Sequence, residues 1–269
     1  MILRGFIDES YDQKIFVLSA LVAIGTEWRW LSRDWTACID RRNKLLLSQD
    51  RNPITRFHAA ECNSQDNEYE GWSREEQIEF MAELIKVLGK SELYSIGWAL
   101  DLEDFNSVFP EVRAANSKSD FLASIYGIMT KFLAFRLAPP FVAANPSVRI
   151  TLVHDRCDYD GVIADAFRKA IEDPGFEEAG CYTSITSAAS VDVIPLQMAD
   201  LLAHENFKET KRRHESGKKE LPKQRTSLKV LIKQGNIGGG VEYIQLNALR
   251  SLAGHLAKTK KRPTVTRSA

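Results

Sequence analysis

The sequence is poor in cysteine and has no long apolar run, and these absences argue against several classes of protein. The four cysteines are widely spaced and form no CxxC pair: Cys38, Cys62, Cys157 and Cys181. This spacing argues against a zinc ribbon or a disulfide framework, and scattered thiols predict a cytoplasmic protein. No run approaches the roughly 18 apolar residues that span a bilayer. The start, MILRGFIDES, lacks the segments of a signal peptide, so we expect no membrane partner.

The chain has no net charge either, because 36 Lys and Arg residues balance 36 Asp and Glu residues. The two signs are unevenly distributed. From residue 206 to the end there are 16 basic and 4 acidic residues, and the preceding part holds 20 basic and 32 acidic residues. An acidic body followed by a basic segment suits a protein that holds cations at one end and a polyanion at the other. A solvated basic helix with a frayed tail is the alternative.

Strand and helix patterns alternate after an initial hairpin. Apolar runs predict strands over 2–8, 14–24, 93–100, 147–155 and 182–190. Helical spacing predicts helices over 28–48, 73–89, 102–108, 119–137, 160–173 and 195–213. This order predicts an α/β domain over residues 1–213, with a mixed β-sheet flanked by helices. Residues 214–269 are expected to be a basic C-terminal extension with a loop, a strand, a helix and a disordered tail. Within it, GNIGGG (235–240) predicts a flexible loop.

Two of the predicted strands end in an aspartate, Asp8 in the first and Asp155 in the fourth. Ligands of α/β sheets tend to lie beyond the carboxyl ends of strands, so neighbouring strands would bring these carboxylates side by side. Alternatives remain open, because Asp8 can begin a turn and either Asp155 or Asp158 can cap the helix predicted from residue 160. Asp158 is the better cap by its spacing, which leaves Asp155 for a ligand.

A third aspartate lies on a helix that is apolar over most of its circumference. In PLQMADLLAHE, a narrow polar stripe is formed at i, i+3 and i+7 by Gln197, Asp200 and His204. A buried carboxylate must be paired, hydrogen-bonded or bound to a metal, because its isolated burial is costly. A fourth acid, Glu61, follows His58 by three residues in FHAAEC and shares its face if that segment is helical. A solvent-facing stripe and an ordinary loop glutamate are the alternatives.

Four converging carboxylates would repel one another, and such a cluster is tolerated only with cations between them. The predicted cluster consists of Asp8, Glu61, Asp155 and Asp200. Oxygen ligands favour Mg²⁺ or Mn²⁺ over zinc. Two such ions, roughly 3.5–4 Å apart, are the usual device for hydrolysing phosphodiesters. The order of acids therefore predicts a metal-dependent nuclease with two bound ions.

Four motifs together resemble a known family. FIDES at the N-terminus, FHAAE at 57–61, VHD at 153–155 and IPLQMADLLAHE at 194–205 resemble the domain-of-unknown-function family 3800 over residues 4–210. That family is mainly prokaryotic and is grouped with RNase H-like folds, in which the first strands form an antiparallel unit and the late aspartate lies on a helix. The family usually has DESG at the first motif, whereas this chain has Asp8-Glu9-Ser10-Tyr11.

The resemblance implies that the four acids named above form the acidic quartet of an RNase H-like nuclease. It implies that Gln197 supports a metal ligand or contacts substrate, and it places His58 and His204 near the metals as candidate proton carriers. For both histidines a structural role is the alternative. Three basic residues continue the Asp200 helix and would follow a nucleic-acid backbone if Asp200 faces a metal: Lys208, Lys211 and Arg212.

These observations predict a nuclease that needs Mg²⁺ or Mn²⁺ and has nucleic acid as its partner. The main alternative is a module of the same fold that binds nucleic acid or a protein and cuts nothing. A third hypothesis is a metal-dependent phosphoester hydrolase that acts on small nucleotides. Neutralising the acids would leave a binding module intact, and dependence on substrate length would separate a nuclease from a nucleotide hydrolase.

Overall fold

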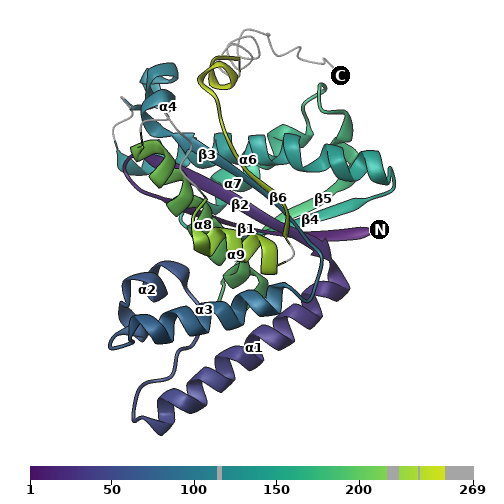
Figure 1. Ribbon diagram of the computed structural model, residues 1–269. Coiled ribbons are helices and arrows are strands. Elements are labelled where there is room, and N and C mark those ends of the chain that lie inside the picture. The colour runs from purple at the N-terminus through teal and green to yellow at the C-terminus, as the bar shows by residue number, and fades with distance from the viewer. Residues whose placement is uncertain (114–116, 217–223, 236, 252–269) are drawn as a thin grey trace.

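The structure, a computed structural model, describes residues 1–113, 117–216, 224–235 and 237–251. These residues form a six-stranded sheet in the order β5-β4-β1-β2-β3-β6, with helices on both faces (Figure 1). The strands are β1 (Ile2–Tyr11), β2 (Ile15–Ile24), β3 (Leu93–Asp101), β4 (Arg149–Asp155), β5 (Tyr182–Ala188) and β6 (Ile237–Tyr243). β1, β2 and β3 are antiparallel to one another in turn, whereas β4, β5 and β6 pair in parallel with β1, β4 and β3. The predicted α/β fold with a mixed, helix-flanked sheet is confirmed.

Two hydrophobic cores, one on each face of the sheet, hold the helices in place. One face carries α1 (Gly25–Ser48), α2 (Ala59–Ser64), α3 (Arg74–Leu88), α8 (Ile194–Glu215) and α9 (Thr226–Gln234). The other carries α4 (Leu102–Val108), α5 (Pro110–Arg113), α6 (Lys118–Ala144) and α7 (Asp160–Ile171). Alternation along β1 places Phe6 in the core with α8 and Ile7 in the core with α6. Because α8 packs against β1 and β2, it covers the face of β1 on which Phe6 and Asp8 lie.

The hairpin of β1 and β2 shows whether Asp8 lies in the turn or in a strand. β1 does not end at Asp8 but continues to Tyr11, so the predicted strand end is wrong by three residues. The turn residue is Asp12, whose Oδ1 accepts hydrogen bonds from Lys14 N (2.8 Å) and Ile15 N (3.0 Å). Asp8 pairs with Ser19 of β2 inside the strand. The turn interpretation of Asp8 is therefore wrong.

The most apolar helix, α6, differs from its predicted length. It continues through Pro139 and Pro140 to Ala144, although the prolines were expected to end it. Each proline removes one hydrogen bond near the end of the helix, and the buried Leu133 and Leu137 anchor the preceding turns in the core. Within the described residues, Ser119–Ala144 is the helix that is long and apolar enough to cross a membrane by length and composition alone. Half of its apolar window is buried against the rest of the protein.

The C-terminal segment adds a strand to the same sheet. Residues 237–240 of GNIGGG belong to β6, which pairs with β3 from Leu93 to Ala99, so the predicted loop is wrong there. Glycine has a low strand propensity, and the free edge of β3 overrides it by offering hydrogen-bond partners. Residues 224–235 and 237–251 thus pack on the domain expected for 1–213. Residues 217–223, predicted as part of a loop, and residues 258–269, predicted as a disordered tail, lie outside the described residues.

A capping box begins α3, the helix predicted over 73–89, and it can be tested. Ser73 Oγ accepts a hydrogen bond from Glu76 N (3.1 Å), and Glu76 Oε2 accepts one from Ser73 N (2.7 Å). We expect Ser73→Ala to lower the free energy of unfolding by about 1 kcal/mol, because an N–H of the first turn loses its partner. Urea denaturation measures this change. Ser107→Ala removes an exposed hydroxyl that donates to the Asp104 carbonyl and is the control. Equal losses in the two variants would contradict the capping role.

Candidate metal centre

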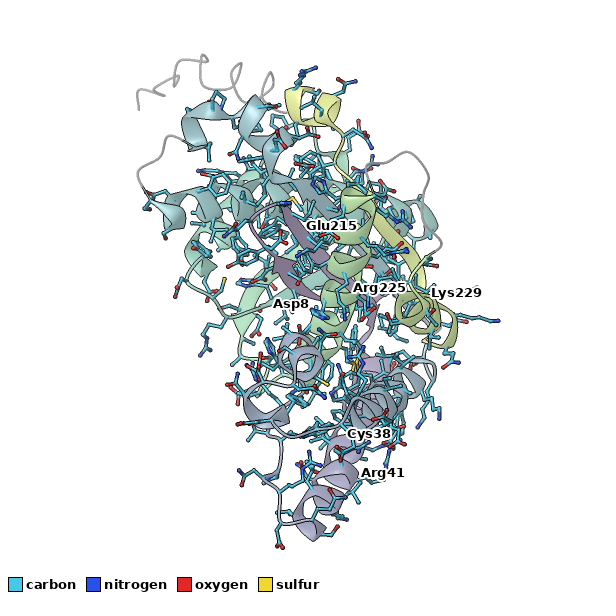
Figure 2. The ribbon with its side chains drawn as sticks, turned by 60° about the vertical axis from the view of Figure 1, so that its left-hand side comes forward. Asp8, Cys38, Arg41, Glu215, Arg225 and Lys229 are labelled. Atoms are coloured by element: carbon cyan, nitrogen blue, oxygen red, sulfur yellow. The ribbon has the colours of Figure 1, made fainter. Side chains whose placement is uncertain are left out.

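The acids selected from the sequence lie where β4 stops and β1 continues. β4 pairs with β1 as far as His154 and Ile7, and it ends at Asp155. Beyond that point β1 continues with β2 as its neighbour, which leaves its other side open. A cavity of about 180 Å³ lies there, and its titratable lining includes Asp8, Glu9, Asp155, Asp200, His58 and His204. Asp8 lies near the middle of the molecule, where the sheet meets the helices of its lower part (Figure 2).

Asp8 is the most deeply buried carboxylate of the cavity. Its side chain is on the same face of β1 as Phe6, toward α8, and the residue is only 9% exposed. Burial raises the pKa of Asp8 well above its ordinary value, and the neighbouring carboxylates raise it further. These neighbours are Glu9, Asp200 and Asp155. Asp8 therefore carries its negative charge only at a high energetic cost unless a cation is near.

Asp200 faces Asp8 from α8. Its Oδ2 accepts a hydrogen bond from the Ala59 backbone N–H over 2.7 Å, so the start of α2 fixes the orientation of this carboxylate. Burial raises the pKa of Asp200 to about 6, although the positive charges of His58 and Arg56 oppose the shift. The predicted meeting of a strand aspartate with the late helical aspartate is thus found in the structure.

Asp155 completes the aspartates of the cavity and is held by two backbone groups. Its Oδ1 accepts hydrogen bonds from Arg156 N (2.9 Å) and Ser190 N (3.0 Å). The expectation that Asp158 caps the following helix is wrong, because the N-cap residue of α7 is Tyr159 and no side chain caps it. Asp155 is therefore oriented by loops at the ends of β4 and β5.

Glu9 lines the cavity although the sequence analysis did not select it. Neighbouring residues of a strand point to opposite faces, so Glu9 points toward α6, where Tyr126 donates a hydrogen bond to its Oε1 over 2.5 Å. Burial raises the pKa of Glu9, and the Tyr126 bond opposes this shift. Both faces of β1 reach the cavity because β4 has already ended. The adjacent acids of FIDES were the signal that could have found it.

Glu61, the remaining member of the predicted quartet, does not line the cavity with these four carboxylates. It is in α2, its Oε1 lies 3.4 Å from His58 Nδ1, and it is absent from the described lining of the cavity. His58, which Glu61 contacts, does line the cavity. The structure therefore brings Asp8, Asp155 and Asp200 together with Glu9, whereas Glu61 contacts His58.

His204 presents an unsatisfied polar atom to this acidic cavity. The residue is 8% exposed, and among the described residues its Nε2 has no hydrogen-bond partner. Burial lowers the pKa of His204 to about 3, and the nearby charges of Lys208 and Arg225 lower it further. The ring is therefore neutral at physiological pH. A buried ring nitrogen without a partner points to a ligand that supplies one.

Gln197 is buried, at 1% exposure, and binds other parts of the protein. Its Oε1 accepts hydrogen bonds from Trp35 Nε1 (3.1 Å) and Phe57 N (3.0 Å), and its Nε2 donates one to Ser190 O (2.9 Å). It joins α1, the segment before His58 and the loop after β5. Its place is behind the cavity, where it positions two of the segments that form the wall.

The three predicted basic contacts differ in their surroundings. Lys211 Nζ lies 2.8 Å from Asp12 Oδ2, and Arg212 Nη2 lies 2.9 Å from Glu209 Oε2. Both are therefore engaged by carboxylates of the protein. Lys208 is one turn beyond His204, and its charge acts on that ring. Of the three, Lys208 is the one for which the structure gives an electrostatic link to the cavity.

A second group of potential metal ligands lies next to Asp155. Two of its polar side chains already form hydrogen bonds within the protein. The donor atoms of His154, Cys157 and Asp160 all lie within 4.8 Å of one another. His154 Nδ1 is 2.9 Å from the Asp155 carbonyl oxygen, which can only accept, so this nitrogen carries a proton. Asp160 Oδ1 accepts the Cys157 N–H over 3.0 Å. This group shapes the turn before α7.

No family model matches the chain, and no curated protein shows a significant match to it. The resemblance of its motifs to the domain-of-unknown-function family 3800 therefore stays a prediction. The carboxylates, the free histidine nitrogen and the position of the cavity are the observations that bear on its function.

Replacing Gln197 tests its structural role. Gln197→Leu would leave Trp35 Nε1, Phe57 N and the Ser190 carbonyl without their partners. We expect it to lower the free energy of unfolding by about 3 kcal/mol, because unsatisfied buried polar groups are costly. Gln13→Leu at the exposed hairpin turn is the matched control. Urea denaturation of both variants measures the change, and equal stabilities would contradict the assignment.

The burial of Asp200 predicts an unusual pH dependence of stability. Because the pKa of Asp200 is about 6 when folded and 3.8 ordinarily, the folded state binds more protons between these values, and its stability falls as pH rises. In EDTA, we expect Asp200→Asn to gain stability relative to the unmodified protein as pH rises from about 4 to about 7. His204 contributes with the opposite sign and cancels in this difference. Urea denaturation at each pH gives the result, and a difference independent of pH would contradict the raised pKa of Asp200.

Proposed function

We propose that this protein is a divalent-metal-dependent nuclease with an RNase H-like fold. The observation that carries the proposal is the meeting of Asp8, Glu9, Asp155 and Asp200 in one small cavity. Their repulsion is relieved by protons or by cations. Carboxylate oxygens are the ligands that Mg²⁺ and Mn²⁺ prefer, and the free Nε2 of His204 is a second, independent sign of a ligand.

The topology supports the proposed fold. The first three strands form an antiparallel unit, the next two strands are parallel, and the late aspartate lies on a helix that packs on β1 and β2. This is the arrangement that the resemblance implies for an RNase H-like domain. It brings the carboxyl end of β4 beside β1, and the candidate metal centre lies at that junction.

The side chains of the cavity have distinct roles in this proposal. Asp8, Asp155 and Asp200 would hold the ions, which when bound would supply an activated water and stabilise the leaving oxygen. The backbone N–H groups of Ala59 and Ser190 keep two of these carboxylates in fixed orientations. Fixed ligands reduce the reorganisation needed when charge develops on the phosphate. Neutral His204 offers its Nε2 to a ligand without adding a positive charge.

The size of the cavity favours a polymer over a small nucleotide. Its volume is about 180 Å³, whereas pockets that enclose a small organic ligand are about 300–1,000 Å³. A phosphate group with its ions suits the smaller volume, and the attached sugars and bases would remain outside. The substrate is therefore held largely on the surface around the cavity, as expected for a nucleic acid.

A cleavage assay tests the proposal. End-labelled RNA, single- and double-stranded DNA and an RNA–DNA hybrid are incubated with the protein in Mg²⁺, Mn²⁺ or EDTA. We expect cleavage of at least one substrate that needs the metal and falls about 100-fold or more in Asp8→Asn and in Asp200→Asn, because each ion contributes several kcal/mol to the transition state.

Asp160→Asn is the matched control, because Asp160 belongs to the neighbouring His154, Cys157 and Asp160 group. Mn²⁺ binding by isothermal titration calorimetry should weaken in Asp200→Asn and stay unchanged in Asp160→Asn. The opposite pattern would move the metal to the neighbouring group. Nucleic-acid binding without cleavage, unchanged when Asp8 and Asp200 are neutralised, would establish the binding module instead.

A further inference from the structure

Cationic side chains lie at one rim of the acidic cavity, on the side of β4 and β5. Arg156 lines the cavity, and its backbone N–H is fixed by Asp155 Oδ1 and by the Ala188 carbonyl, each at 2.9 Å. Within the described part of the chain, its guanidinium has no hydrogen-bond or ion-pair partner. Arg56 donates from Nη1 to Ser190 Oγ over 2.8 Å, and Ser190 also lines the cavity.

A second cationic group follows His204 along α8. Lys208 Nζ donates to Asn63 Oδ1 of α2 and lies 3.7 Å from Glu205 Oε1. Arg74, at the start of α3, is close enough for its charge to act on Lys208. Glu205, whose carboxylate pairs with Lys208, is 1% exposed. Positive charge therefore exceeds negative charge at this end of the cavity.

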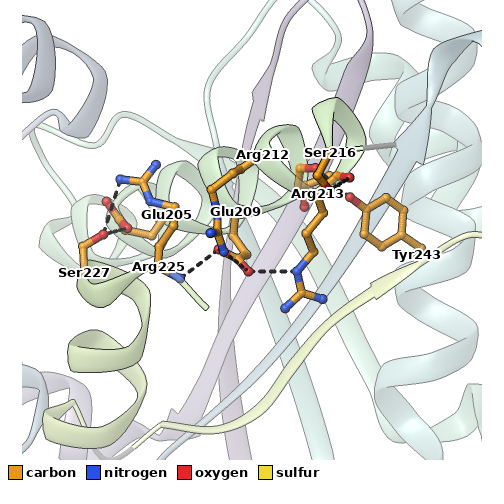
Figure 3. Close-up of polar contacts among 9 residues, drawn as sticks. Glu205, Glu209, Arg212, Arg213, Ser216, Arg225, Ser227 and Tyr243 are labelled. Atoms are coloured by element: carbon orange, nitrogen blue, oxygen red, sulfur yellow. Dashed lines mark hydrogen bonds and ion pairs between the residues drawn. The ribbon is translucent and has the colours of Figure 1, made fainter. Parts of the chain in front are cut away.

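The C-terminal segment contributes Arg225 to the second group (Figure 3). Its backbone N–H donates to Glu209 Oε2 over 3.0 Å, and its Nη2 donates to Ser227 Oγ over 3.4 Å. Ser227 in turn donates to Glu205 Oε2 over 2.5 Å. Arg225 is thus fixed beside Lys208, and the charges of both act on His204 at the cavity.

The two cationic groups lie on opposite sides of Asp200 along α8. Ser190 precedes the helix beside β5, whereas Asn206 of the helix bonds Ser19 of β2 and Thr210 bonds Tyr243 of β6. The helix therefore runs from the β5 side of the sheet to the β6 side, with Asp200 between. Eight residues of helix separate Asp200 from Lys208, a rise of about 12 Å.

We propose that a nucleic-acid strand crosses the cavity along α8, with Arg56 and Arg156 binding its backbone on one side of the cut and Lys208 and Arg225 on the other. A strand held by both groups has phosphates on both sides of the bond at the metal centre, so on this path cleavage is internal. The protein is then an endonuclease. This inference rests on the proposed function, because it assigns the bond between the two groups to the metal centre.

Binding and cleavage are measured on the same variants. Fluorescence anisotropy with labelled single-stranded RNA and DNA in Ca²⁺, at several salt concentrations, gives the affinity and its salt slope. We expect Arg156→Ala and Arg225→Ala each to weaken binding several-fold and to reduce the slope of log K against log salt by about 0.7. Lys229→Ala is the matched control, because Lys229 is exposed on α9 and points away from Asp8 (Figure 2). It should change neither quantity.

Covalently closed single-stranded circles test whether cleavage needs a free strand end. An endonuclease linearises a circle, whereas an enzyme that needs an end leaves it intact. Cleavage of circles in Mg²⁺ or Mn²⁺, reduced in Arg156→Ala and in Arg225→Ala but not in Lys229→Ala, is the expected result. Shortening of linear strands with intact circles would overturn the proposal.

Mn²⁺ titration of the same proteins separates this inference from the proposed function. If Mn²⁺ binding and cleavage are normal and both arginine variants behave like Lys229→Ala, the strand path is wrong and the nuclease stands. If the protein neither binds Mn²⁺ nor cleaves, yet Arg156→Ala and Arg225→Ala weaken binding, the nuclease is wrong and the path survives as a binding surface. Absence of any nucleic-acid binding overturns the path.

Discussion

The repulsion between carboxylates at the end of β4 is the constraint around which this molecule is built. Asp8, Glu9, Asp155 and Asp200 meet in one cavity, and the pKa values of Asp8 and Asp200, raised first of all by burial, record what a negative charge costs there. The surrounding structure opposes this cost by fixing the acids with backbone N–H groups from three segments. A stable core would not require this arrangement, since apolar side chains would fill the same space at lower energy. Its presence is best explained by what the cavity binds.

Much of the fold follows from local patterns. The hairpin and the limits of α4 are found as predicted. Each depends on periodicity or on a cap, which neighbouring residues determine. The errors are of another kind. β6 contains four residues of GNIGGG because β3 offers it a free edge, and α6 continues past two prolines because its preceding turns are buried. Tertiary contacts decide both, and a single sequence does not display them.

The same distinction applies to the candidate metal centre. Asp8, Asp155 and Asp200 could be selected because two follow apolar runs and one interrupts an apolar helix. Glu9 was missed because strand alternation assigns it to the opposite face, and only the early end of β4 brings both faces to the cavity. Glu61 was placed with the acids, but it contacts His58 and is absent from the described lining of the cavity. Lys211 pairs with Asp12, a residue far away in the chain. The sequence alone therefore could not predict that the charge of Lys211 is neutralised within the protein.

The parallel pairing of β6 with β3 has a consequence for synthesis of the chain on the ribosome. Residues 93–101 emerge early, yet the strand that covers their outer edge is completed only at Tyr243. During the interval, the edge of β3 has unpaired backbone groups beside apolar side chains, a state that favours association with other chains. Chains interrupted before residue 237 would keep that edge open. Strand β6 therefore covers the edge of β3 in full-length chains only. An exposed edge is what distinguishes an incomplete chain from a complete one.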